Sequence, residues 1–453
     1  MNRRGLALAA GAAAIVVAAL LATDVWPGLR GPENWQWQRR VFLSPWLLAS
    51  VAVFAVTLRG AGWFARVRGG TFAAAALIFA QMVLLTAAEP QGLARVGERV
   101  ESPSFTSYDT VARGVDDPRE FLKRYPRIQD RFPVHGPSQP PGRVLYFWTL
   151  RQWLGDGAPP VAGFLLMAFG AMTVVPLATL GGRRRADPAH GPDTAHGPDR
   201  PALLALMACL PAYLLFTPQT DHLILFLSVS AAAALVAGLR AGRRGRAVAL
   251  GSVAGICAGL GVFVSFTTLA ALGAWGLAVA GMWAVAARQG RRPPSEGAMP
   301  TAAAALTGFV AVTGVIAALG LDWIAVFRKC TEAAHRVQVL IHGREYSTWV
   351  VWNLVDFTLF LGVALAMAVG VRIRGEWRAE DRGEIPFATA LLVAVLVLDV
   401  SGKILGETGR IWVFLMPLAV AAAASLPRVP IAALACAQFL LVLALRAFLN
   451  VPG

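Results

Sequence analysis

The sequence predicts an all-α polytopic membrane protein, and three observations lead to this prediction. The 453 residues are 57% hydrophobic and only 15% charged, and the mean hydropathy is +0.59. A soluble protein of this size would need far more polar surface. Apolar runs of membrane-spanning length recur along the whole chain. Basic residues gather in alternate loops, as they do in multi-pass proteins.

The apolar runs predict about thirteen transmembrane helices. The first run follows Asn2-Arg3-Arg4 and could alternatively be a cleaved signal peptide. Its length and the many helices after it favour a membrane helix. The expected spans are residues 5–22, 41–58, 71–88, 160–180, 201–217, 221–239, 247–266, 268–286, 301–320, 350–371, 386–400, 410–426 and 428–446.

The arginine clusters predict the orientation of the chain. Arginines gather at 59–68, 183–185, 240–246, 288–292 and 372–382. All of these loops share one side if the N-terminus is cytoplasmic, because short basic loops resist translocation. We therefore predict a multi-pass protein of the cell (plasma) membrane with an external loop at 89–158. The formal net charge of +15 reflects this topology and does not predict nucleic acid as a partner.

Five regions follow from this topology. Residues 1–88 are N-terminal transmembrane helices, and 89–158 form an external catalytic-type loop with an interfacial helix. Residues 159–320 are central transmembrane helices, 321–349 are a second external loop, and 350–453 are C-terminal transmembrane helices. The repeat of Ala-His-Gly-Pro-Asp near residue 190 is typical of a flexible linker. The four cysteines are scattered singly, without the spacing of a metal or redox site.

Most ionisable side chains outside the basic loops fall on the expected external face. An ionised group at membrane depth costs roughly 2.5–3.5 kcal/mol, so Asp356 and Asp399 need partners or an aqueous cavity. Arg344, Lys403 and Arg410 are the expected partners. Helix-linking salt bridges would explain any one of these residues, whereas the whole set favours a polar external cavity. Its candidate residues are Tyr108, Asp109, Asp116, Asp117, His135, Arg143, Asp221, His222, His335, Arg344, Tyr346, Asp356, Lys403, Glu407 and Arg410.

Carboxylates beside clustered cations suit a substrate that carries a phosphate. A carboxylate can take the proton of a hydroxyl, and cations can stabilise the charge on a departing phosphate. The chain has neither a P-loop nor a G-x-G-x-x-G motif between a strand and a helix. It also lacks the H-E-x-x-H and G-x-S-x-G motifs. An external enzyme has no access to nucleotide sugars, so a lipid-linked donor is the expected substrate.

The external loop resembles that of GT-C type glycosyltransferases that use polyprenyl phosphates, particularly the protein mannosyltransferase and lipid A aminoarabinose transferase branch. The resemblance lies in "TSYDTVARGV" and in "QPPGRVLYFWTL", the start of an aromatic helix. It implies a GT-C-like fold and places Asp109 as the catalytic base. Asp116 and Asp117 are the alternatives, because the family's acidic pair stands here as Tyr108-Asp109. Gln139 takes the place of a more usual basic residue before two prolines, and His135 could compensate.

The second external loop leaves two interpretations open. Glu332, His335 and His342 could hold a divalent cation, since carboxylate and imidazole are ordinary ligands of such ions. Arg344 and Tyr346 could instead bind an acceptor or a phosphate. The sequence leaves a requirement for a divalent cation open, and no metal ligand is assigned.

The sequence favours a glycosyltransferase that moves a sugar from a polyprenyl-phosphate donor to an external envelope lipid, glycan or protein, with inversion. Its partners would be this donor, an envelope acceptor and membrane lipid. The alternative is a transporter or flippase for a lipid-linked or anionic substrate, since membrane-depth charges also mark transport routes. A third hypothesis is an acyl- or phosphotransferase with His135 or His222 as the base.

Overall fold

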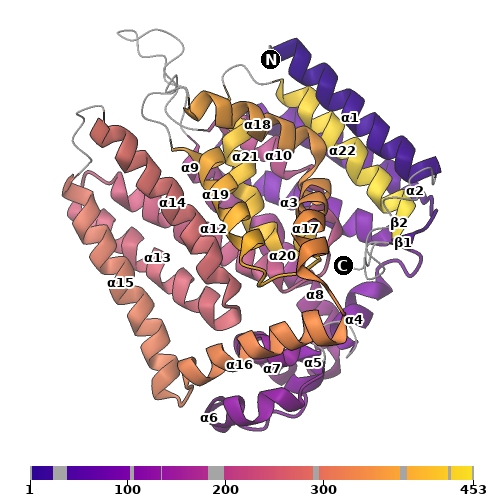
Figure 1. The fold of residues 1–453 in the computed structure, drawn as a ribbon. Coiled ribbons are helices and arrows are strands. Elements are labelled where there is room, and N and C mark those ends of the chain that lie inside the picture. Colours follow the sequence, from indigo (N-terminus) through magenta and orange to yellow (C-terminus); the bar gives the residue numbers. More distant parts are fainter. Residues whose placement is uncertain are drawn as a thin grey trace.

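The computed structural model describes residues 3–23, 38–102, 107–133, 135–181, 198–288, 295–377, 385–426 and 430–450. Most of these residues are helical (Figure 1). The longer helices are α1 (Arg3–Thr23), α2 (Pro45–Phe64), α3 (Gly70–Ala87), α7 (Gly142–Leu154), α8 (Ala158–Met172), α9 (Val174–Leu180), α12 (Asp221–Leu239), α13 (Arg244–Val264), α14 (Thr267–Arg288), α15 (Ser295–Ala318), α16 (Trp323–His335), α17 (Tyr346–Leu361), α18 (Val363–Trp377), α19 (Phe387–Val400) and α22 (Ile431–Phe448).

Shorter elements join these helices. They are β1 (Gln38–Arg39), α4 (Ala94–Glu101), α5 (Tyr108–Ala112), α6 (Pro118–Ile128), η2 (Gln129–Arg131), η3 (Gly136–Ser138), η4 (Gly155–Gly157), α10 (Arg200–Met207), α11 (Pro211–Leu215), the π-helical η5 (Arg336–Ile341), α20 (Thr408–Ile411), η6 (Trp412–Leu415), α21 (Met416–Ala424) and β2 (Leu449–Asn450). The two strands pair antiparallel, which ties the segment before α2 to the end of α22.

Local sequence explains where several helices begin. The Ser44 hydroxyl accepts a hydrogen bond from the Trp46 backbone, and Pro45 occupies the first turn of α2. Asp117 caps α6 and Asp322 caps α16 in the same way. Such caps satisfy backbone N–H groups that have no partner inside the helix. Proline fits the first turn because its missing N–H would be unpaired there anyway.

The structure confirms a polytopic helical membrane protein. Nine helical segments within the described residues are long and apolar enough to span a membrane, and the bent pair α17–α18 can form a tenth. The sequence predicted about thirteen spans. All thirteen apolar segments are at least partly helical, but three do not reach spanning length as continuous helices: 201–217, 386–400 and 410–426.

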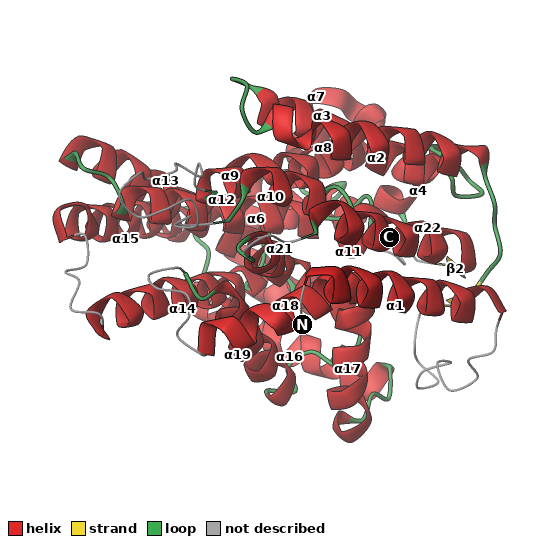
Figure 2. Cartoon of the chain, turned by 90° about the horizontal axis from the view of Figure 1, so that it is seen from above, coloured by secondary structure: helices red, strands yellow, loops and turns green. Residues whose placement is uncertain are grey.

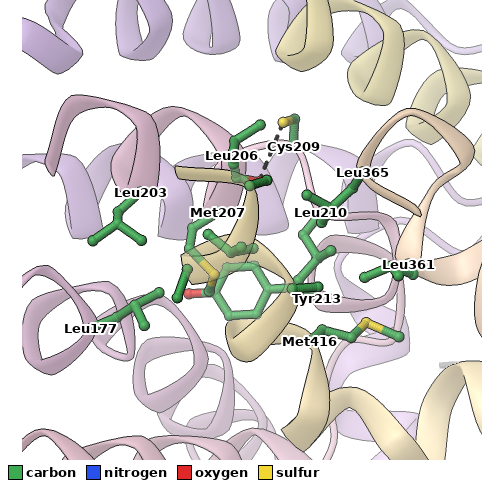
Figure 3. Close-up of a cluster of buried hydrophobic side chains, with 14 of the residues drawn as sticks. Leu177, Leu203, Leu206, Met207, Cys209, Leu210, Tyr213, Leu361, Leu365 and Met416 are labelled. Atoms are coloured by element: carbon green, nitrogen blue, oxygen red, sulfur yellow. Dashed lines mark hydrogen bonds between the residues drawn. The ribbon is translucent and has the colours of Figure 1, made fainter. Parts of the chain in front are cut away.

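The segment 201–217 illustrates why the predicted number was too high. Leu210 precedes Pro211 and has an extended backbone, as expected because proline disfavours the α conformation in the residue before it. The segment therefore folds as two short helices, α10 and α11, in the centre of the bundle. Tyr213 of α11 packs there among Leu177, Leu361 and Met416 (Figure 3).

The predicted external loop is a helical layer with its own apolar core. Figure 1 shows α4, α5, α6, α7 and α16 together at one end of the long helices, whereas α1 begins at the opposite end. Tyr108, Phe121, Tyr125 and Phe147 are buried in this layer and pack in the same cluster as Val326 of α16. Seen from above, α1 and α22 run side by side on another flank (Figure 2), and these two helices are in contact.

One side chain forms hydrogen bonds with the backbone on both sides of the break between α17 and α18. The two helices meet at 105°, and Gly362 lies between them with φ +92°. Gln438 of α22 donates to the Leu361 carbonyl at 2.8 Å and accepts from the Leu365 backbone at 3.4 Å. A Cβ on Gly362 would lie 2.0 Å from Gln438 Oε1. Only glycine fits both this conformation and this contact.

We therefore predict that Gly362→Ala lowers the free energy of unfolding by about 1–3 kcal/mol, the usual cost of such backbone strain. The melting temperature of the purified protein in detergent measures the effect. Gly370→Ala is the matched control, because Gly370 is in α18 and has open space around its Cβ position. Equal melting temperatures of the two variants would contradict the role of Gly362.

Candidate active site

A cavity of about 910 Å³ lies where the helical layer meets the ends of the long helices. Five parts of the chain contribute to its lining: residues 108–143, the turn before α12, the α13–α14 connection, α16 with η5 and the start of α17, and the segment from the end of α19 to α20. The predicted site residues that line it are Tyr108, His135, Gln139, Arg143, Asp221, His335, Arg344, Tyr346, Lys403, Glu407 and Arg410. The structure thus brings five separate parts of the sequence to one cavity.

Arg143 of α7 holds one half of this cavity together. Its side chain is buried and donates to Thr220 Oγ1 at 2.6 Å, Asp221 Oδ1 at 3.1 Å and the Tyr108 hydroxyl at 3.2 Å. A further bond reaches the Val264 carbonyl at the end of α13, at 3.3 Å. The guanidinium group offers five donors in a rigid plane, and its four hydrogen bonds here join α5, α7, α12 and α13.

The segment before α7 places Arg143 correctly. Pro140 and Pro141 precede the helix, and a Cβ on Gly142 would lie 2.3 Å from the Phe263 carbonyl. Glycine therefore allows α7 to begin in contact with the end of α13. Gln139 is bonded on both sides, because its carbonyl accepts from the Tyr125 hydroxyl at 2.7 Å and its Oε1 accepts from the Ser265 hydroxyl at 2.9 Å.

Glu407 organises the other half of the cavity. It is buried and accepts from Arg344 at 3.1 Å and from Arg410 at 2.5 Å. Burial alone would raise the pKa of Glu407, but Arg410 and Arg344 outweigh it and lower the pKa to about 2. The carboxylate thus stays ionised at neutral pH. Glu407 also has φ +57°, a strained conformation that is typical of functional sites when found outside glycine.

The charges that line the cavity do not balance. Among the described residues of the lining, the four cationic side chains Arg143, Arg344, Lys403 and Arg410 stand against the two carboxylates Asp221 and Glu407. Lys403 is exposed and forms no ion pair within the described residues. Four minus two leaves an excess of two positive charges, and the Glu407 half holds this excess.

His135 lies between the two halves. Burial, and then the positive charge of Arg410, lower its pKa to about 4, while Glu407 and Asp221 act in the opposite direction. The imidazole is therefore neutral at physiological pH and can both donate and accept a hydrogen bond. Burial raises the pKa of Tyr108, so its hydroxyl remains protonated.

The three carboxylates proposed as the base from the sequence do not line the cavity. Asp109 is buried in α5, where Arg151 binds its two oxygens at 2.6 Å each and Arg113 approaches at 3.2 Å. Asp116 and Asp117 are exposed near the start of α6, and Asp117 caps that helix. Asp109 therefore ties α5 to α7, which positions its neighbour Tyr108 in the cavity.

Two further candidates, His222 and Asp356, are also absent from the cavity lining, as is Asp399. His222 is buried and its Nε2 lies 3.1 Å from the Tyr213 carbonyl. Asp356 accepts from the Gly409 backbone at 2.7 Å, and Asp399 accepts from the Asn353 amide at 3.0 Å. The expected pairing of these two aspartates with Arg344 and Arg410 was wrong, since both arginines form ion pairs with Glu407.

A divalent cation finds no ready site in the described part of the chain. His335 and His342 line the cavity, but no group of three or more His, Cys, Asp or Glu side chains there is arranged to hold a metal ion.

Sequence reasoning missed a buried network that supports the cavity from behind. Glu89, just after α3, accepts from Arg99 at 2.7 Å and from Arg446 of α22 at 2.6 Å. The same arginines donate to the carbonyls of Thr217 and Leu215, at the turn that leads to α12. The sequence signal was a glutamate at the end of an apolar run, but its partners lie far away in the chain.

Comparison with known proteins gives one likeness to report. No family model and no curated protein matches the chain. The chain is similar to a solved structure of the Archaeoglobus fulgidus oligosaccharyltransferase in complex with Zn and sulfate, with a TM-score of 0.46 and 16% identity. The match covers 83% of this chain and 54% of that one, so this chain spans about half the length of that enzyme.

The lowered pKa of His135 predicts a pH effect on stability. The folded protein keeps this imidazole neutral down to about pH 4, whereas the unfolded chain binds a proton below its ordinary pKa of 6.5. The neutral imidazole of His135 therefore makes its full contribution to the free energy of unfolding above pH 6.5, and this contribution is lost as the pH falls through 4. His135→Gln should weaken the fall in melting temperature between pH 6.5 and 4. The exposed His335→Gln is the control, and equal slopes for wild type and His135→Gln would contradict the assignment.

Proposed function

We propose that this protein is an integral membrane glycosyltransferase. It transfers a sugar from a polyprenyl-phosphate donor to a cell-envelope lipid, glycan or protein acceptor on the external face of the cell membrane. The observation that carries this proposal is a single cavity that combines an accessible carboxylate, Asp221, with an excess of two positive charges. A carboxylate can remove the proton of an acceptor hydroxyl, and the cations can stabilise the negative charge of a lipid phosphate.

The Glu407 half of the cavity suits the phosphate. Arg344 and Arg410 are held in place by Glu407, and Lys403 extends from the neighbouring segment. Such preorganised cations stabilise the negative charge that develops on a leaving group without having to reorient during the reaction. Arginine is also well suited to phosphate, because its planar group can donate two parallel hydrogen bonds.

We place the catalytic base at Asp221 rather than at Asp109. Asp221 lines the cavity, and its Oδ2 has no hydrogen-bond partner within the described residues, since Arg143 binds Oδ1. Both oxygens of Asp109 are bound to Arg151, and its side chain is 1% exposed. An acceptor hydroxyl in the cavity can therefore reach Asp221 without breaking an existing bond.

The reaction is a single displacement with inversion. Asp221 takes the proton of the acceptor hydroxyl. At the same time the oxygen of that hydroxyl forms a bond to the anomeric carbon of the donor sugar. The bond from that carbon to the phosphate oxygen breaks, and its electron pair leaves with the lipid phosphate beside Arg344, Lys403 and Arg410. The products are the glycosylated acceptor and polyprenyl phosphate. Asp221 then releases its proton to solvent.

The location of the cavity supports the external face. The cavity lies at the end of the bundle where α16 and the helical layer gather, whereas α1 begins at the other end (Figure 1). Because Arg3 and Arg4 precede the apolar part of α1, the positive-inside rule puts that other end in the cytoplasm. Nucleotide-linked sugars are absent outside the cell, which favours a lipid-linked donor.

One observation favours transport as a second candidate function. Transporters often bind their substrate at interrupted membrane helices, and α17–α18 is such a pair. The side chain of Gln438 occupies this break, however, and Gly362 does not line the cavity. We therefore prefer the enzyme, and the experiment below separates the two functions.

We predict that purified protein in liposomes releases polyprenyl phosphate from at least one member of a panel of polyprenyl-phosphate sugars, when an envelope extract supplies the acceptor. Asp221→Asn should lower kcat by about 10²–10⁴-fold, the usual contribution of a general base. Asp109→Asn should act mainly on stability, because it weakens a buried ion pair.

Melting temperatures of both variants provide the control for folding. A folded Asp221→Asn variant with wild-type turnover would contradict the assignment of the base. No turnover of any donor, together with movement of intact donor across the bilayer, would contradict the enzyme and support transport.

Lys403 offers a separate test of the phosphate site. Lys403→Gln removes an exposed charge from the cavity and should raise the KM for the donor about 3–10-fold, which corresponds to roughly 1 kcal/mol, the net contribution of a typical hydrogen bond. The matched control is Lys123→Gln, because Lys123 is a lysine of α6 outside the cavity lining. An unchanged KM in Lys403→Gln would place the phosphate elsewhere.

A further inference from the structure

Gln219 is a cavity residue that the mechanism above does not use. It lines the cavity two residues before Asp221, and its side chain is nearly fully buried. Its amide nitrogen is buried without a hydrogen-bond partner in the described part of the chain. A buried amide without partners is uncommon and costly, so it needs an explanation.

The turn that carries Gln219 is held rigidly from the side opposite the cavity. The Thr217 hydroxyl bonds to that of Thr86 at 2.8 Å, and the Thr217 carbonyl accepts from Arg99. The Gln219 carbonyl in turn accepts from the His222 backbone at 3.2 Å. These contacts fix the turn, and Gln219 is among the residues that line the cavity. A fixed turn whose amide nitrogen has no partner within the described residues suits a preorganised recognition site.

Gln219 and Asp221 are close enough to bind one small group together. Two residues along a chain span at most about 7 Å, and both side chains line the same cavity. Asp221 accepts a proton from the attacking hydroxyl. An amide can donate or accept a hydrogen bond, so Gln219 suits a second polar group beside that hydroxyl.

We propose that the acceptor is a glycan whose attacking hydroxyl has a neighbouring hydroxyl, and that Asp221 binds the first and Gln219 binds the second. This inference rests on the proposed function and narrows its acceptor class. An acceptor with an isolated hydroxyl, such as a serine or threonine side chain, would satisfy Asp221 and leave Gln219 unpaired. A sugar ring satisfies both groups.

The size of the cavity agrees with this acceptor. Its volume is about 910 Å³, near the top of the range of about 300–1,000 Å³ that is usual for small-molecule sites. The lipid phosphate occupies the Glu407 half, the donor sugar follows, and the acceptor ring lies against Gln219 and Asp221.

The test compares acceptors in liposomes that contain a donor turned over by the wild type. The acceptors are hexyl glycosides of common envelope sugars, their monodeoxy analogues, and a threonine-containing peptide. The wild type should transfer to a glycoside and not to the peptide. Loss of the neighbouring hydroxyl should lower kcat/KM about tenfold, as expected for one hydrogen bond.

Gln219→Ala should lower kcat/KM for the parent glycoside by the same factor and bring the ratio of parent to deoxy analogue close to one. Gln219→Glu keeps the shape of the side chain and serves as the second variant if Gln219→Ala does not fold. The matched control is Gln81→Ala: Gln81 of α3 is also a buried amide without partners in the described residues, but it does not line the cavity. It should keep the wild-type ratio.

Three results would overturn the inference while the donor chemistry stands. They are transfer to the peptide, donor cleavage without transfer to any glycoside, and an unchanged ratio in both Gln219 variants. Absence of turnover with every donor would instead overturn the proposed function, and this inference with it.

Discussion

One buried guanidinium group, that of Arg143, joins the segments on which the cavity depends. A charge that leaves water must be paired and fully hydrogen-bonded, or its desolvation destabilises the fold. Arg143 meets this requirement with bonds to Tyr108, Thr220, Asp221 and the end of α13. The same contacts therefore serve the fold and the proposed reaction, because the hydrogen bonds that Arg143 needs also hold the side chain of Asp221 at the cavity wall. The same logic applies to Glu407, whose two arginine partners become the candidate phosphate ligands.

The general form of the protein could be predicted from the sequence, since membrane helices depend on local hydrophobicity. Each predicted apolar run contains a helix. The number of spanning helices could not be predicted as well, because length in the membrane depends on where a helix breaks. Leu210-Pro211 is a local signal for such a break. At Gly362, in contrast, the bend is stabilised by Gln438 from a distant helix, and no sequence window contains both residues.

The candidate site also has features that local sequence predicts and features that depend on the fold. Residue types in the segments predicted to be external were enough to select Arg143, Asp221, Lys403 and Arg410, because ionised groups near a membrane have few explanations other than function or pairing. Sequence could not decide which carboxylate faces the cavity. Asp109 and Asp221 both stand in polar segments, and only the fold turns one toward Arg151 and the other toward the cavity. The role of Gln219 was also hidden, since an unpaired amide can be recognised only when its surroundings are known.

The central claim is that the cavity binds a lipid phosphate in its Glu407 half. The most direct measurement is a cryo-electron microscopy structure of the protein in nanodiscs with a polyprenyl phosphate, the product of the proposed reaction. The account predicts density for the phosphate within hydrogen-bond distance of Arg344, Arg410 or Lys403, with the lipid chain leaving the cavity toward the bilayer. A phosphate bound outside the cavity, or a cavity that stays empty at saturating lipid, would contradict it.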